Sequence, residues 1–117
     1  MTIELGVSPH VLLDLFDSKQ ISTGMSREVP GGARIQLVVM RETRGFPSIQ
    51  GTAFVPILLT IGTGVTIKML ADFLTEKLKG EDKARRMMTI NRKLVEVTTP
   101  EAMVKILTEE IKIEERK

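Results

Sequence analysis

Fifteen consecutive residues near the middle of the chain carry no charge, and this run constrains the fold more than any other feature. It reads AFVPILLTIGTGVTI over residues 53–67 and leads directly into KMLADFLTEKLKG, which ends at Gly80. An apolar segment of this length has to be buried in a core, in a partner or in a membrane. Its first part, residues 53–61, is compatible with a buried strand or with the first half of one long helix.

We expect the helix over residues 53–61. Pro56 is tolerated in a first helical turn, whereas in a central strand it removes a hydrogen-bond donor. The Gly-Thr-Gly run at residues 62–64 then lies in mid-helix, where it bends the helix or lets another backbone approach. The later part has a core stripe at helical spacing, with Gly80 as the stop signal. This stripe comprises Met69, Leu70, Phe73, Leu74 and Leu78.

Local signals define the remaining elements. Pro at the first helical position, preceded by Ser or Thr, marks two helix starts, at Pro9 and Pro100. Alternating apolar residues mark strands, and clusters of Gly, Ser and Pro mark loops. The expected elements are a strand over residues 2–7, a helix over 9–19, a loop over 21–32, a strand over 33–43, a loop over 44–51, a hairpin of 87–90 and 93–97 turning at Asn91 and Arg92, and a helix from 100.

This order of elements, β-α-β-α-β-β-α, predicts an α+β fold in which helices cover one face of a small, mostly antiparallel sheet. With 117 residues, of which 42% are hydrophobic and 27% charged, the chain is expected to form a single domain over residues 1–117. The chain has seven Met but no Trp or Tyr, which predicts an adaptable interior or an apolar partner surface.

Composition also excludes several kinds of chemistry. The chain has no Cys, so disulfides, thiolate nucleophiles and Cys-ligated zinc are excluded. The absence of Cys and of a signal peptide predicts a cytoplasmic protein. His10 is the single histidine, lies in the first turn of an expected helix and has no second histidine to share a metal. We therefore expect no enzymatic activity, no metal and no cofactor.

The run from Ile61 to Lys68 is similar to the start of a phosphate-binding loop. A Walker loop requires Gly-Lys followed by Ser or Thr, whereas Lys68 follows Ile67 and precedes Met69. A dinucleotide-binding fingerprint requires a small residue at the position of Ile67. The glycines are better explained by close helix packing.

Two binding alternatives remain open at this point. The first is a polyanion site for nucleic acid in a basic stretch near the end of the expected middle helix and along the hairpin. It comprises Lys77, Lys79, Lys83, Arg85, Arg86, Arg92 and Lys93. The second is membrane association through residues 52–74, although Lys68 and Asp72 interrupt this segment and disfavour a full span.

The leading hypothesis is a protein–protein interaction module that associates with itself or with a partner. Met103, Val104, Leu107 and Ile111 give the last helix a core stripe. Ile106 and Ile113 widen its apolar arc to about half the circumference, more than a helix on one sheet needs. Ile106 and Ile113 are therefore the candidate oligomer interface.

The second half of the chain resembles the effector-associated constant component family of bacterial conflict systems. The likeness covers residues 54–111 and rests on IGTGVTIKMLADFLTEKLKG, a basic link, the hairpin and the helix start TTPEAMVKIL. The chain lacks the Trp that family members tend to show late in the first of these helices, and Thr99 stands where they have Asp. The resemblance implies an adaptor or scaffold role and supplies no catalytic residues.

Overall fold

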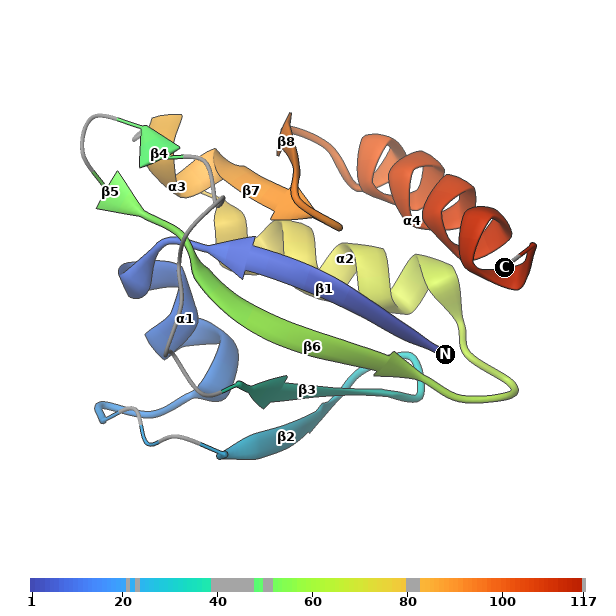
Figure 1. The fold of residues 1–117 in the computed structure, drawn as a ribbon, viewed down its shortest axis with the longest axis horizontal. Coiled ribbons are helices and arrows are strands. Elements are labelled where there is room, and N and C mark those ends of the chain that lie inside the picture. Colours follow the sequence, from blue (N-terminus) through green and yellow to red (C-terminus); the bar gives the residue numbers. More distant parts are fainter. Residues whose placement is uncertain (21, 23, 39–47, 50–51, 80–82, 117) are drawn as a thin grey trace.

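The computed structural model describes residues 1–20, 22, 24–38, 48–49, 52–79 and 83–116, and its elements are drawn in Figure 1. In chain order they are β1 (Thr2–Val7), α1 (Pro9–Phe16), β2 (Ser26–Val29), β3 (Ala33–Leu37), β4 (Ser48–Ile49), β5 (Thr52–Ala53), β6 (Val55–Ile61), α2 (Ile67–Leu78), α3 (Lys83–Arg86), β7 (Met87–Ile90), β8 (Lys93–Glu96) and α4 (Pro100–Glu115).

Six of these strands form one open antiparallel sheet in the order β2-β3-β6-β1-β7-β8. Strands β4 and β5 form a separate short hairpin. Alternate residues of the central strands, such as Ile3, Leu5, Ile57 and Leu59, are buried, and they share one core with the buried faces of α1, α2 and α4. The predicted α+β class, with helices on one face of an antiparallel sheet, is therefore confirmed (Figure 1).

The expectation of a helix over residues 53–61 is wrong, because β6 occupies residues 55–61 in the centre of the sheet. Pro56 is compatible with this position for a geometric reason. Ile61 N–H donates to Met1 O, so the odd-numbered residues of β6 hydrogen-bond to β1 and the even-numbered residues face β3. The nitrogen of Pro56 thus points toward Val38. This residue lies beyond Leu37, the last residue of β3 that pairs with β6. No ladder hydrogen bond is lost there.

The glycine run at residues 62–64 also differs from the expectation, since it forms the turn between β6 and α2 rather than the middle of a helix. Gly64 has a φ of 80° there, a conformation that favours glycine. In addition, the loop expected over residues 21–32 contains β2 at Ser26–Val29, which pairs with β3 across a turn at two positive-φ glycines, Gly31 and Gly32. The sheet therefore has two more strands than the sequence predicted.

The elements with strong local signals are confirmed. The hairpin of β7 and β8 turns at Asn91 and Arg92, which both have positive φ. The Thr99 hydroxyl accepts a hydrogen bond from Ala102 N–H at the start of α4. Strand β3 covers residues 33–37 of the strand expected at 33–43, and residues 39–43 lie outside the described residues. The short helix α3 precedes β7 and was not predicted.

Candidate interaction surface on helix α2

Helix α2 divides its side chains between the core and the surface. Leu70, Ala71, Leu74 and Leu78 are buried. The opposite side carries an exposed row in which polar residues recur at helical spacing and one large apolar residue is included. This row comprises Lys68, Met69, Asp72 and Glu76.

Met69 was expected in the core stripe of this helix, and this expectation is wrong. Met69 is 52% exposed, the largest value among the exposed large hydrophobic residues that the structure describes. Successive residues on a helix diverge by about 100°, so Met69 lies beside Leu70 and off the centre of the buried arc. The structure centres the buried arc on residues 70, 71 and 74, and the sequence signal for this was the small apolar Ala71 beside Leu70.

The turn between β2 and β3 fixes the start of α2. Thr66 N–H donates to Gly31 O at 2.8 Å. Gly31 has a φ of 99°, and a Cβ on Gly31 would lie 2.8 Å from Thr66 O and 3.0 Å from Leu70 N. Only glycine allows the turn to approach the helix this closely. The turn thus sets the position of the first exposed residues of the row.

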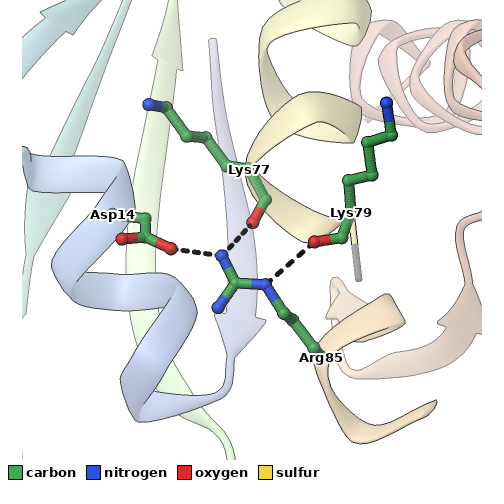
Figure 2. Close-up of polar contacts among 4 residues, drawn as sticks. All are labelled: Asp14, Lys77, Lys79 and Arg85. Carbon is green, nitrogen blue, oxygen red and sulfur yellow. Dashed lines mark hydrogen bonds and ion pairs between the residues drawn. The ribbon is translucent and has the colours of Figure 1, made fainter. Parts of the chain in front are cut away.

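Arg85 holds the other end of α2 (Figure 2). Its guanidinium donates to Lys79 O at 3.1 Å and to Lys77 O at 3.0 Å, and it forms an ion pair with Asp14 of α1. The two carbonyl groups lie at the C-terminal end of α2, where backbone acceptors lack partners within the helix. Arg85 therefore joins α1, α2 and α3 at one corner of the molecule.

A groove runs between α2 and α4 on the outer side of the helical layer. It consists of two adjoining cavities of about 430 Å³ and 340 Å³, which share Asp72 and Pro100. Apolar lining comes from Val97, Pro100 and Val104, and both signs of charge occur along the rim. The rim residues are Lys68, Asp72, Glu76, Lys79, Arg86 and Glu101.

A second depression of about 420 Å³ lies on the other side of the exposed row, next to the turn between β2 and β3. Its apolar lining is Pro30, Met69 and Phe73. Two cations lie over the Phe73 ring, with the Arg27 guanidinium carbon 5.6 Å and Lys77 Nζ 5.5 Å from its centroid. Cations in this position hold the ring in a fixed orientation at the surface.

Asp72 lines the groove and the second depression alike, so they form one continuous region. We call this region the α2 surface and define it by the exposed row of α2, Phe73, Pro30 and the apolar lining of the α2–α4 groove. It combines apolar side chains with a mixed-charge rim, the usual composition of a protein-binding surface.

The glycine turn at residues 62–64 has the strand–turn–helix context that a phosphate loop requires. However, Thr66 N–H, which precedes the helix, already donates to Gly31 O at 2.8 Å. One of the donors that would hold an anion at the start of α2 is therefore occupied by the chain itself.

The structure divides the predicted basic stretch between the two ends of β7. Lys77, Lys79, Lys83, Arg85 and Arg86 lie at the end of α2 or in α3, whereas Arg92 and Lys93 lie at the β7–β8 turn. Arg85, Arg86, Arg92 and Lys93 form ion pairs with Asp14, Glu96, Glu4 and Glu110, respectively. No single face gathers these four cations, and polyanion binding stays a prediction.

Ile106 and Ile113 lie on one flank of α4. They are seven residues apart, so they share one side of the helix. Ile106 packs against the core, and Ile113 is 39% exposed. Val104, which lines the groove next to α2, lies on the opposite flank. The two isoleucines therefore face away from α2.

The described residues contain no group of three or more His, Asp or Glu placed to hold a metal ion. His10 is exposed in the first turn of α1. Within the same described part of the chain, no helix has the length and apolar character needed to cross a bilayer, and residues 52–74 are divided among β5, β6 and α2.

Comparison of the chain with protein-family models, with curated proteins and with solved structures gave no match.

Proposed function

We propose that the protein is a non-enzymatic interaction module that binds a partner protein through the α2 surface. The observation that carries this proposal is the continuity of the groove and the second depression around Asp72, with Met69 exposed beside them. An exposed, flexible Met side chain adapts its shape to a partner at little cost. Large apolar side chains gathered at the surface are typical of binding sites.

The geometry fits a polypeptide partner. At 1.5 Å per residue, the twelve residues of α2 extend over about 18 Å, comparable to the length over which a short helix or strand makes contact. The mixed charges at the rim supply hydrogen bonds and specificity around the apolar centre. An adaptor or scaffold role in a bacterial conflict system, acting in the cytoplasm, is part of this proposal and rests on the resemblance of residues 54–111.

Photo-crosslinking at single positions tests the proposal. A photoreactive phenylalanine analogue at Met69 should give one dominant covalent adduct in cells of the source organism, and Asp72→Arg should remove that adduct. The matched control is the same analogue at Arg34, which is exposed on the uncovered face of the sheet. Equal adducts at both positions, or an adduct at Met69 that Asp72→Arg leaves unchanged, would contradict the proposal.

A further inference from the structure

Strand β8 ends the sheet with main-chain groups that the sheet does not use. Val97 N–H donates to Arg86 O, so the odd-numbered residues of this strand hydrogen-bond to β7. The N–H and C=O groups of Leu94 and Glu96 therefore point away from β7. No described strand lies beyond β8 in the sheet order. An edge of this kind is a template for another strand.

Leu94 adds an apolar side chain to this edge. It is 41% exposed, although leucine usually contributes to the core. Edge strands are commonly protected by a charged residue or a proline. Of the two outward-bonding residues of β8, Glu96 is charged, whereas Leu94 has no such protection and favours pairing.

We propose that a second copy of this chain pairs with β8 as an antiparallel strand about a twofold axis at Leu94. In this register, Leu94 exchanges two main-chain hydrogen bonds with Leu94 of the other copy, and the two leucine side chains become neighbours. Residues whose numbers add up to 188 lie opposite one another. Arg92, in the turn that precedes β8, is then brought near Glu96 of the other copy.

Charge complementarity supports a second copy as the occupant. The strand carries positive charge at its first end, from Arg92 and Lys93, and negative charge at its other end, from Glu96. Each of these side chains forms an ion pair within its own chain, but they stay 58%, 60% and 39% exposed, respectively, and can also interact with a second copy. Antiparallel pairing of two identical strands brings opposite ends together, so the basic end of one copy lies beside the acidic end of the other. A parallel arrangement would instead place like charges side by side.

Helix α4 extends the same interface. A twofold axis perpendicular to the sheet leaves the helical layers of both copies on the same side. Glu110 of α4 accepts hydrogen bonds from Asn91 and Lys93 at the β7–β8 turn, so α4 lies over this end of the sheet. The flank of α4 that carries Ile106 and Ile113 faces away from α2. The two flanks thus face each other across the axis, and the exposed Ile113 gains an apolar neighbour. Both α2 surfaces stay free, so the dimer presents two partner-binding surfaces.

Sedimentation equilibrium between about 10 µM and 1 mM tests the proposal, since an interface this small predicts a weak dimer. The wild-type mass should rise from one chain toward two. Leu94→Pro should stay monomeric but folded by circular dichroism, because the lost N–H points outward and makes no bond inside the chain. Leu94→Lys should also abolish the dimer, and Ile113→Lys should weaken it at least tenfold.

Cross-linking gives a second, independent measurement. The chain has no Cys, so Leu94→Cys introduces one unique thiol. Oxidation should convert it to a disulfide-linked dimer, because directly opposite hydrogen-bonded residues lie at about 5.5 Å between Cα atoms. The matched control is Ser26→Cys, which is exposed on β2 at the other edge of the sheet and should stay monomeric.

A wild-type chain that stays monomeric at 1 mM would overturn the proposal. So would a dimer that survives Leu94→Pro and Leu94→Lys, or one that cross-links through Ser26→Cys instead of Leu94→Cys. Met69→Lys should leave the dimer mass unchanged, because Met69 lies on the α2 surface. Failure of the dimer and failure of partner binding are therefore distinguishable.

Discussion

The two ends of β7 both carry cations of the basic stretch, but they use them differently. At the end that α3 precedes, Arg85 is bound to two main-chain carbonyls of α2 and to the partly exposed Asp14. At the β7–β8 turn, Lys93 Nζ lies 2.9 Å from the carboxylate of Glu110, whose side chain is only 8% exposed.

The β7–β8 turn is the more demanding of the two corners. Asn91 Nδ2 donates to the Glu110 carboxylate at 2.9 Å, and Asn91 Oδ1 accepts from Glu4 N–H at 3.0 Å. One amide side chain thus connects α4, the turn and β1. Burial of a carboxylate costs folding free energy unless the group is paired and hydrogen-bonded. The carbonyl groups of a partly exposed helix end can instead form hydrogen bonds with water. The comparison shows that cations close together in the sequence can have two different structural roles: one binds the end of a helix, and the other neutralises a buried carboxylate.

The largest expected effect is at the β7–β8 turn. Asn91→Ala should lower the free energy of unfolding by about 3 kcal/mol, because it removes two side-chain hydrogen bonds and places alanine at a φ of 48°. Asn91→Gly keeps the backbone conformation without strain and should lose only about 2 kcal/mol. Urea unfolding followed by circular dichroism measures both. If the free energy of unfolding of both variants stays within about 0.5 kcal/mol of wild type, the Asn91 side chain does not stabilise this turn.

A smaller loss is expected at the other corner. Arg85→Ala should lower the free energy of unfolding by about 2 kcal/mol, because it leaves the last carbonyls of α2 to water. Arg85→Lys should recover only part of this loss, since an ammonium group lacks the planar fork that reaches several acceptors. The same urea titration applies. Complete recovery by lysine would show that charge alone, and not the geometry in Figure 2, holds this corner.

The smallest effect is expected for a neighbouring cation whose side chain takes no part in that contact. Lys79→Ala should change the free energy of unfolding by less than about 0.5 kcal/mol, because Arg85 binds the main-chain oxygen of Lys79. Figure 2 shows the Lys79 ammonium group directed away from the guanidinium. A loss as large as that of Arg85→Ala would show that the Lys79 side chain itself stabilises this corner.

Several features of the fold follow from the sequence because their signals are local. The hairpin of residues 87–96 has a two-residue turn between apolar runs, and α4 begins with Thr99 and Pro100. Both depend on backbone preferences within a few residues. The same holds for α1 with Ser8 and Pro9. These elements could be predicted without knowledge of their tertiary contacts.

The candidate interaction surface could be predicted only in part. The sequence places Lys68, Asp72 and Glu76 on the outside of α2 by their charge. The sequence analysis placed Met69 in the core, because helical spacing alone does not show whether a methionine faces the core or the solvent. It also gave no sign that the β2–β3 turn would contact the start of α2 through Gly31. That contact joins residues 35 positions apart.

By itself, the sequence determined the fold class, the two well-marked helix starts, the β7–β8 hairpin and the absence of cysteine chemistry. Only the tertiary structure decided that residues 55–61 form a strand. The apolar run there satisfies a helix and a buried strand equally well, and β1 and β3, which pair with it on both sides, come from distant parts of the chain. Strand pairing is a non-local hydrogen-bond pattern, so no window along the sequence contains it.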